Sequence, residues 1–260
     1  MRVILVRDYE EMSDRAAQIV IEAMRENPDL NFAGASGSTP RGLYERLAGA
    51  CGGGLDCSSL GAFTLDEYVG LGPDHPQSLR RFMDDALFDH VNIPDSNIHS
   101  PDGLSESLRA TCAEYERLIE EKGGIDVFVL GIGRDGHIGF NEPGTSLGSR
   151  THVTGLAPET VEDNARFFDN VTEVPRFAIT VGIETILDGD LLLLMANGAN
   201  KARAVAQALE GPVSASVTAS AIQLHPNVIA VIDAEAASQL KRRDYYRWEE
   251  DSRPMIEDKL

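Results

Sequence analysis

Asp126-Val-Phe-Val-Leu-Gly-Ile-Gly-Arg-Asp-Gly-His-Ile-Gly-Phe-Asn-Glu-Pro-Gly144 is an apolar run that opens into a glycine-rich loop. The uninterrupted apolar residues up to Leu130 are typical of a strand that is buried on both faces of a parallel sheet. The glycines and Pro143 prevent the following segment from continuing as a strand or forming a helix. A long loop that leaves a buried strand is usually functional, so this stretch predicts a site at the end of the strand.

Three side chains of the loop can exchange protons: Asp135, His137 and Glu142. A carboxylate two residues from an imidazole can fix the tautomer and orientation of the ring and raise its pKa. Glu142 can act as a third member of such a relay. The alternative is a tight loop in which the aspartate and the histidine bind only neighbouring backbone groups. We favour the functional role and take all three residues as catalytic candidates.

Strands and helices are expected to alternate along the chain. Apolar runs predict strands at residues 2–6, 31–35, 60–65, 125–130, 177–181, 190–195 and 228–232. Amphipathic patterns predict helices at residues 9–25, 40–47, 79–88, 105–121 and 201–209, the first capped by Asp8 with Glu11 in the capping-box position. The alternation predicts a doubly wound α/β fold, a mostly parallel Rossmann-like sheet with helices on both faces. Because no repeat or linker interrupts the pattern, we expect a single domain over residues 1–260.

Charge and apolar content exclude several classes of protein. The formal net charge of -19 argues against nucleic acid and anionic membranes as partners, and the acid excess suggests a salt-adapted organism. No apolar run approaches the length of a membrane span, and the N-terminal segment is charged too early for a signal peptide. We therefore expect a cytoplasmic protein. Cys51, Cys57 and Cys112 have no zinc spacing and are expected to be reduced, partly buried thiols.

The residues that follow each strand are the candidates for a site, because ligands of doubly wound sheets bind beyond the carboxyl ends of the strands. The second expected strand runs into Ser36-Gly37-Ser38-Thr39-Pro40, with Thr39 as the expected helix cap and Pro40 as the first helical residue. Small hydroxylated residues before a helix N-terminus form an anion site from backbone N–H groups and the helix dipole. The Gly-Lys-Ser/Thr ending of a nucleotide-triphosphate loop is missing, which leaves a phosphate loop or a simple capped turn.

Two adjacent carboxylates, Asp66 and Glu67, follow the third expected strand. Successive side chains of a strand point to opposite faces, so one of the two is expected to face the site, and the pattern does not decide which. A carboxylate at a strand end beside an apolar wall can act as a general base. The alternatives are a helix cap and a surface charge.

Cations stand in two further segments. Lys201 lies at a helix N-terminus, where its charge opposes the helix dipole unless an anion binds there. Arg166 lies between aromatic residues, a setting that alone is commoner for a surface or packing arginine. The Gly-x-Gly-x-x-Gly spacing that starts at Gly131 is a weak dinucleotide signature, since no helix opens within it. One imidazole with scattered carboxylates is a poor zinc set, and an oxygen-rich magnesium site remains an alternative.

Together these residues resemble the glucosamine-6-phosphate deaminase family, the sugar-phosphate isomerase-deaminases that share a fold with 6-phosphogluconolactonase. The matching segments cover nearly the whole chain in order and at similar spacing: Ser36-Gly-Ser-Thr-Pro40, Leu65-Asp-Glu-Tyr-Val-Gly-Leu71, Asp135-Gly-His-Ile-Gly-Phe-Asn-Glu-Pro143, Ser149-Arg-Thr151, Ala165-Arg-Phe-Phe-Asp-Asn170 and Leu224-His-Pro226. The combination of the Asp-Glu-Tyr, Asp-Gly-His and Asn-Glu-Pro segments is highly specific, and lactonase relatives lack the full set.

The resemblance implies an enzyme of amino-sugar catabolism that isomerises and deaminates glucosamine 6-phosphate to fructose 6-phosphate and ammonium. It implies that Asp66 moves a proton at C2 of the open-chain sugar and that His137, oriented by Asp135 and Glu142, assists ring opening. The residues that it implies for the substrate phosphate are Ser36, Gly37, Ser38, Thr39, Arg166 and Lys201. It implies a small amino-sugar phosphate as the partner and neither a metal nor an organic cofactor.

The chain departs from the family pattern at two places. Many bacterial hexameric members carry two basic residues just after the Ser-Arg-Thr match, where an activating amino-sugar phosphate binds between subunits, whereas this chain has His152 and Thr154. The activator site and the hexamer are therefore left open, with a homo-oligomer kept as an alternative. The phosphate loop has Ser38 where many members have glycine.

Two other functions are kept as alternatives. The first is a 6-phosphogluconolactonase-like enzyme, which the segment Asp66-Glu-Tyr68 argues against. The second is a non-catalytic regulator that binds a sugar phosphate. Such a regulator would usually have lost a catalytic carboxylate or the histidine, whereas this chain keeps all four groups.

Overall fold

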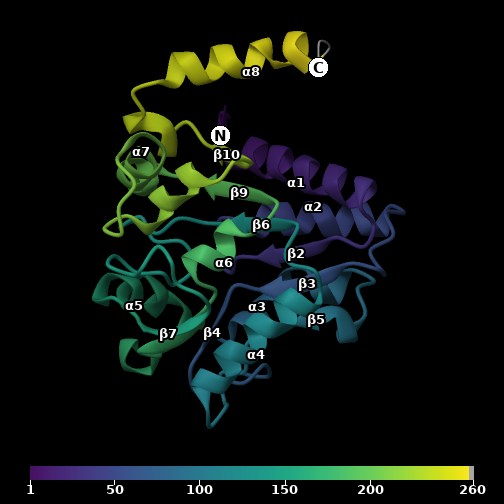
Figure 1. Ribbon diagram of the computed structural model, residues 1–260, viewed down its shortest axis with the longest axis vertical. Coiled ribbons are helices and arrows are strands. Elements are labelled where there is room, and N and C mark those ends of the chain that lie inside the picture. Colours follow the sequence, from purple (N-terminus) through teal and green to yellow (C-terminus); the bar gives the residue numbers. More distant parts are fainter. Residues whose placement is uncertain (258–260) are drawn as a thin grey trace.

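The computed structural model describes residues 1–257 (Figure 1). Its strands form two sheets. The larger sheet has seven strands in the order β1-β10-β9-β6-β2-β3-β5, and its neighbouring strands pair in parallel. The strands are β1 (Arg2–Leu5), β2 (Asn31–Gly34), β3 (Gly61–Thr64), β5 (Ile98–His99), β6 (Val127–Leu130), β9 (Leu191–Ala196) and β10 (Val228–Ile232).

Helices cover both faces of this sheet, so the predicted doubly wound, mostly parallel α/β fold is confirmed. Val127 and Val129 of β6 face the core that holds α1 (Tyr9–Glu26), α2 (Arg41–Gly52) and α3 (Leu79–Ala86). Phe128 and Leu130 face the opposite core, which holds α4 (Leu108–Glu121), α6 (Ile183–Leu187) and α7 (Ala202–Glu210). Successive side chains of β6 point alternately into the two cores, which explains why its sequence is apolar throughout.

The second sheet is small and antiparallel, with the order β4-β8-β7. Its strands are β4 (Asp66–Tyr68), β7 (His152–Gly155) and β8 (Phe177–Thr180), and Asp66 lies opposite Thr180. The prediction placed residues 177–181 in the parallel sheet, and this was wrong. A short apolar strand has the same composition in either sheet, and its partner β4 begins directly after β3, where the patterning marks no boundary.

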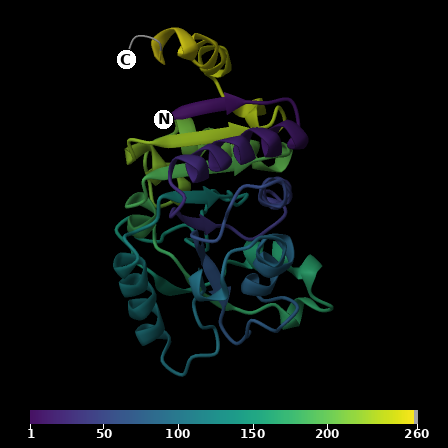
Figure 2. The ribbon, with the colours of Figure 1, turned by 90° about the vertical axis from the view of Figure 1, so that its right-hand side faces the viewer.

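Two helices lie away from the main layers. The first, α5 (Pro158–Asn164), follows β7, and the second, α8 (Arg243–Glu257), ends the described chain. Figures 1 and 2 show α8 beyond the β1 edge of the sheet, where Arg2 forms an ion pair with Glu250. Within residues 1–257, no helix combines the length and the apolar character needed to cross a membrane.

The predicted helix caps are confirmed in part. Asp8 accepts a hydrogen bond from the backbone N–H of Glu11 at 2.9 Å, as the cap of α1 should. The carboxylate of Glu11 accepts from the N–H of Arg7 instead of completing a capping box. The prediction for α2 was wrong by one residue, since Pro40 is the N-cap and Thr39 makes no cap bond.

The expectation that all three cysteines are free thiols is corrected. Cys51 and Cys57 form a disulfide with a Cα–Cα distance of 6.3 Å, whereas Cys112 is free and buried. Cys51 lies in the last turn of α2, and the glycines that follow it turn the chain back. The prediction of free thiols rested on the expected cytoplasmic location and on the lack of zinc spacing. It did not consider that the turn after α2 brings Cys57 back to Cys51.

Candidate active site

Four adjacent strands of the parallel sheet, β9, β6, β2 and β3, deliver the candidate segments to one edge. Because parallel strands share an orientation, their carboxyl ends meet at the same side of the sheet. The segments that leave these strands begin at Asn197, Gly131, Ala35 and Leu65. The sheet order therefore brings together residues that lie up to about 160 positions apart in the chain.

His137 lies between two carboxylates of its own loop. Its Nδ1 atom is 2.8 Å from Oδ1 of Asp135 and 3.3 Å from Oε2 of Glu142. Asp135 also accepts the backbone N–H of His137 at 3.2 Å. The loop folds tightly enough for this because a Cβ on Gly133 would lie 2.4 Å from the imidazole ring. Two acids on Nδ1 leave Nε2 as the nitrogen that can meet a substrate.

The charges around His137 favour the imidazolium form. Burial lowers its pKa, but hydrogen bonding to Asp135 and Glu142 and their negative charges outweigh burial and raise the pKa to about 9. Burial raises the pKa of Asp135, but the hydrogen bond and charge of His137 prevail and lower it to about 2. At neutral pH the pair is therefore an aspartate and an imidazolium, which can donate a proton.

Glu142 connects this cluster to the next segment of the chain. It is 7% exposed, and its Oε1 atom accepts the backbone N–H of Ala157 at 3.0 Å, just before α5. The same carboxylate thus holds both the imidazole and the start of the helix that leads to Arg166.

Asp66 and Glu67 have opposite surroundings, which resolves the choice that the sequence left open. Glu67 accepts hydrogen bonds from the N–H groups of Leu79 and Arg80, both at 3.0 Å, and from the hydroxyl of Ser78 at 2.6 Å. It therefore caps the N-terminus of α3, which was one of the alternatives. A cavity of about 320 Å³ is lined by Glu67 and not by Asp66, so it lies on the capping side.

Asp66 faces the His137 loop. A Cβ on Gly139 would lie 3.9 Å from its Oδ2 atom, and its Oδ1 atom is 3.5 Å from the hydroxyl of Ser36. Burial, followed by the charge of Glu67, raises the pKa of Asp66 to about 7, although Ser36 and His137 act in the opposite direction. A buried carboxyl that titrates near neutrality is suited to general base catalysis.

The predicted phosphate loop presents free backbone donors. In the part of the chain that the structure describes, the N–H groups of residues 36–39 donate to no protein acceptor. Gly37 has a φ of 121°, which favours glycine. The hydroxyl of Thr39 donates to the side chain of Asn197 at 2.9 Å, so it anchors the loop to the segment after β9. Consecutive free N–H groups before a helix form an anion-binding concavity.

Asn197 is a contact that the sequence argument missed. The Asn197-Gly198 turn is held in place because Gly198 donates its N–H to the buried carboxylate of Asp233. The Thr39 bond therefore ties the phosphate loop to a fixed turn, which lies four residues before Lys201. Neither partner shows a sequence pattern that indicates this pairing.

The two predicted cations differ in their surroundings. Lys201 is half-buried, and burial lowers its pKa while Asp163 and Asp135 raise it and Arg134 and Arg166 lower it. Arg166 is exposed on a 3₁₀ turn, with its guanidinium 4.7 Å from the ring centre of Phe167. The structure thus places Arg166 within electrostatic reach of Lys201 and gives it a stacking partner.

A further ion pair joins the loop that bears His137 to α5. The guanidinium of Arg134 binds both carboxylate oxygens of Asp163 at 2.8 Å. Asp163 lies three residues before Arg166, so the pair connects the loop that bears His137 to the segment that bears the arginine. The sequence argument missed it because the two residues are far apart in the chain.

Asp135, His137 and Glu142 are also a candidate metal set, since their ligand atoms lie within 4.8 Å of one another. Their arrangement suits a proton better than a metal ion. Both carboxylates converge on Nδ1, at 2.8 Å and 3.3 Å, as ion-pair partners of the imidazolium. A zinc ion would need at least three ligand atoms around itself at about 2.0–2.2 Å, and atoms placed tetrahedrally at that distance lie farther apart than the 2.8 Å between Nδ1 and Asp135.

Comparisons with known proteins agree with this geometry. A family model for glucosamine-6-phosphate isomerases and 6-phosphogluconolactonase matches residues 7–230. The glucosamine-6-phosphate deaminase of Arthrobacter sp. strain FB24 is 46% identical over 255 residues, covering 98% of each chain. That of Thermoanaerobacter pseudethanolicus is 45% identical over 245 residues, covering 94% of this chain and 97% of the relative.

Solved structures extend the comparison to the fold. A monomeric glucosamine-6-phosphate deaminase has a TM-score of 0.90 and 43% identity, covering 92% of this chain and 100% of its own. The 6-phosphogluconolactonase of Trypanosoma brucei has a TM-score of 0.76 at 19% identity, covering 92% of this chain and 98% of its own, and shares the fold. The chain therefore belongs to the glucosamine-6-phosphate isomerase/6-phosphogluconolactonase family, in which its high sequence similarity is to the deaminases.

Proposed function

We propose that the protein isomerises and deaminates glucosamine 6-phosphate to fructose 6-phosphate and ammonium. The observation that carries this proposal is the pairing of a buried carboxyl, Asp66, with an imidazole held by two carboxylates on the adjacent loop. An acid and a base with separate pKa values are what ring opening and proton transfer at carbon require. The similarity to deaminases over nearly the full chain supports the same substrate.

Ring opening is the first step of the proposed mechanism. The C1–O5 bond breaks, O5 gains a proton from His137, and the C1 hydroxyl then gives its proton to the neutral imidazole as the carbonyl forms. The imidazolium of His137 is the donor to O5, since Asp135 and Glu142 hold its charge and orientation. Lys201, Arg166 and the free N–H groups of residues 36–39 bind the phosphate and so place the sugar.

Proton transfer and deamination follow in the open-chain sugar. Asp66 removes the C2 proton, and the electron pair forms a C1–C2 double bond that carries the hydroxyl and the amine. His137 returns its proton to the carbonyl oxygen, which becomes that hydroxyl. Return of the proton to C1 leaves an imine at C2. Water adds to this imine, and ammonia leaves with a proton as the C2 carbonyl forms. The raised pKa of Asp66 suits a base that must both take and return a proton.

The test is ammonia release from glucosamine 6-phosphate by the purified protein, with EDTA and without added metal. We expect release in both conditions and a loss of about 10²–10⁴-fold in Asp66→Asn. Release that stops with EDTA and returns with a divalent ion would contradict the metal-free mechanism. No release, with glucosamine 6-phosphate still raising Tm, would favour the regulator, and hydrolysis of 6-phosphogluconolactone would favour the lactonase.

We also propose a cytoplasmic location, in accordance with a phosphorylated substrate, and a single functional domain over the whole chain. The assembly state is a separate question, because the similar deaminase of known structure is monomeric. His152 and Thr154, the residues that replace the basic pair, both lie on β7. We propose that this strand lacks the activator site of hexameric relatives. Ammonia release that is unchanged by N-acetylglucosamine 6-phosphate would support this.

A further inference from the structure

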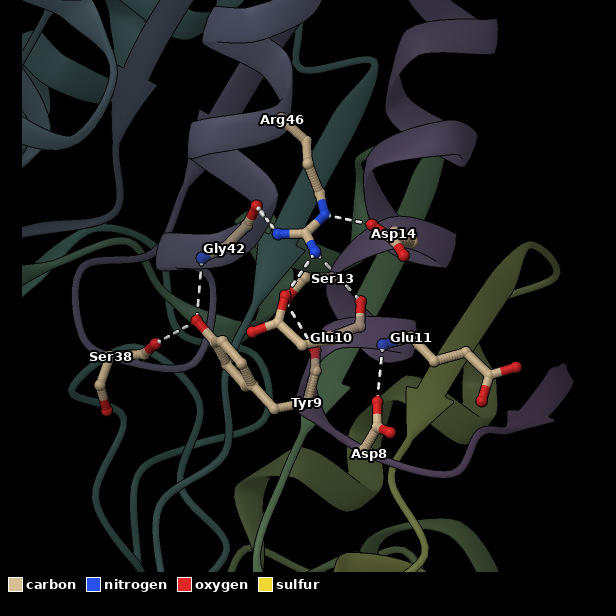
Figure 3. A network of polar contacts seen from close by, with 9 residues as sticks. All are labelled: Asp8, Tyr9, Glu10, Glu11, Ser13, Asp14, Ser38, Gly42 and Arg46. Carbon is tan, nitrogen blue, oxygen red and sulfur yellow. Dashed lines mark hydrogen bonds and ion pairs between the residues drawn. The ribbon is translucent and has the colours of Figure 1, made fainter.

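Tyr9 reaches from the first turn of α1 to the back of the phosphate loop (Figure 3). Its hydroxyl donates to the backbone carbonyl of Ser38 at 3.0 Å and accepts the backbone N–H of Gly42 at 2.9 Å. One hydroxyl therefore connects the loop with the first turn of α2. Neither bond belongs to the proposed chemistry, because neither involves Asp66, His137 or their carboxylate partners.

The neighbouring residues fix where this hydroxyl lies. A Cβ on Gly42 would be 2.4 Å from Oγ of Ser13 and 3.1 Å from the Tyr9 hydroxyl, so glycine permits the close approach of α1 and α2. Arg46 of α2 holds the two helices together, since it binds the carboxylates of Glu10 and Asp14 and donates to the carbonyl of Gly42 (Figure 3). The contacts of Arg46 therefore hold the N-terminal ends of α1 and α2 together, and these ends fix the position of the phenol.

The bond to Ser38 sets the orientation of one peptide group. In a trans peptide the C=O and the following N–H point in opposite directions. Since the carbonyl of Ser38 points to Tyr9, the N–H of Thr39 points away from α1. Among the described residues this N–H has no protein acceptor. The Thr39 side chain meets Asn197, so the same residue is held on a second side.

We propose that Tyr9 is a positioning residue, whose hydroxyl orients the phosphate loop so that its backbone N–H groups face the substrate phosphate. This inference rests on the proposed function, because it assigns the loop to that phosphate. Without the hydroxyl, the carbonyl of Ser38 and the N–H of Gly42 lose their shared partner, and the peptide group rotates more freely. Phosphate binding then has to order the loop, which weakens it. Asp66 and His137 are untouched, so the chemical step keeps its rate.

The test compares Tyr9→Phe with Tyr245→Phe in the full chain, since Tyr245 is 54% exposed on α8 and serves as a matched control. In Tyr9→Phe we expect KM for glucosamine 6-phosphate to rise about 3- to 10-fold, which corresponds to roughly 0.7–1.4 kcal/mol. We expect kcat to stay within about twofold and Kd for inorganic phosphate, from calorimetry, to rise by a factor similar to that of KM. The control should leave all three unchanged.

Other outcomes separate this inference from the proposed function. Unchanged KM and phosphate Kd in an active Tyr9→Phe enzyme, with or without a lower Tm, would mean that the hydroxyl only stabilises the fold. A wild-type protein that binds phosphate but releases no ammonia would contradict the deaminase, while the effect of Tyr9→Phe on Kd would still decide the positioning role. If the variant is less stable, the constants are compared at a temperature at which both proteins are folded.

Discussion

At the scale of single residues, Asp66 links activity to stability. Burial, with the charge of Glu67, raises its pKa from 3.8 to about 7. Between these values the folded state holds a proton that the unfolded state has lost, so stability falls as pH rises from about 4 to 7. Above pH 7 the charged form costs the fold at most roughly 4 kcal/mol. If Asp66 is the base that we propose, activity requires a buried carboxylate that destabilises the fold.

Asp66→Asn should accordingly stabilise the protein while lowering its activity by about 10²–10⁴-fold. The asparagine is neutral at every pH, so we expect Tm to rise at pH 8 and the gain to disappear towards pH 4. Thermal unfolding at pH 4, 6 and 8 measures this. Ser78→Ala is the control, since it weakens the cap of α3 without changing a charge and should lower Tm. A gain of equal size at all three pH values would show that relief of buried charge is not the cause.

The pH dependence of kcat/KM should report both catalytic groups. Activity rises as Asp66 loses its proton near pH 7 and falls as His137 loses its proton near pH 9. In Asp135→Asn the imidazolium loses its closest carboxylate, so the pKa of His137 falls and the basic limb moves to lower pH. Rates of ammonia release from pH 5 to 10 check this. A basic limb that is unmoved in Asp135→Asn would assign that limb to another group.

Some contacts of the site residues could be predicted from the sequence, and others could not. The spacing of Asp135 and His137 predicted their contact, because both lie in one short loop. Strand alternation predicted that Asp66 and Glu67 point apart, but the choice depends on a helix that begins twelve residues beyond Glu67. The hydroxyl of Tyr9 finds its partners only when α1 and α2 meet. Local chemistry was therefore predictable, and contacts between distant segments were not.

At the scale of elements, the start of the helix α7 and the segment after α5 carry the two cations that we propose for the substrate phosphate. Lys201 immediately precedes α7, and Arg166 follows α5 on a 3₁₀ turn. Because burial lowers the pKa of Lys201, the site disfavours an uncompensated charge there, and a phosphate dianion would relieve this cost. A bound phosphate should thus stabilise both elements.

Lys201→Ala and Arg166→Ala are each expected to raise KM by about tenfold or more with a smaller change in kcat, since they remove a charge-assisted bond to the phosphate. Lys201 should show the larger effect, because it is the more buried of the two. Steady-state kinetics with glucosamine 6-phosphate measures both. Lys241→Ala, at an exposed position, is the matched control. Unchanged KM in both site variants would remove these residues from the phosphate pocket.

The end of α2 offers a test of the disulfide. Cys51 and Cys57 close a loop of only six residues' separation, so the chain-entropy contribution is small, about 2 kcal/mol. We expect a reducing agent to lower Tm by a few degrees and leave KM unchanged. The variant with Cys51→Ser and Cys57→Ser should not respond to the reductant. An equal response in this variant would mean that the reductant acts elsewhere, and no response in either would mean free thiols, as the sequence suggested.

Element prediction succeeded where the hydrophobic period was sustained and failed where elements were short. The helices α1 and α4 and the core strands β2, β6 and β9 lie within a few residues of the predicted ranges. The two-residue strand β5 and the three-residue strand β4 are too short for a period to be visible. The strand β7 alternates between half-buried and exposed residues, so it lacks an apolar face.

At the scale of the whole molecule, the strand order creates the site. The order β9-β6-β2-β3 places the four candidate loops side by side. Alternating strands and helices predicted a parallel sheet but not its order, because order depends on which crossovers pack best in three dimensions. The antiparallel sheet then places Asp66 opposite Thr180. The sequence therefore predicted which loops belong to the site. Which of these loops lie next to each other became known only from the fold.

The charge balance of the molecule leads to a last prediction. The chain has 42 acidic and 23 basic residues, hence a net charge of -19, so acids outnumber the bases that could pair with them. Mutual repulsion of like charges destabilises the compact state, and salt screens it over a Debye length that shrinks from about 10 Å at 0.1 M to about 3 Å at 1 M. We therefore expect Tm to rise with KCl from 0.1 to 1 M, as proposed for a salt-adapted protein. Thermal unfolding at pH 5 is the control, because repulsion weakens there as carboxylates take up protons. A flat or falling curve of Tm against KCl at pH 7.5 would contradict this prediction. It would show that salt weakens the existing ion pairs, such as Arg46 with Glu10 and Asp14, by at least as much as it relieves the repulsion between the excess acids.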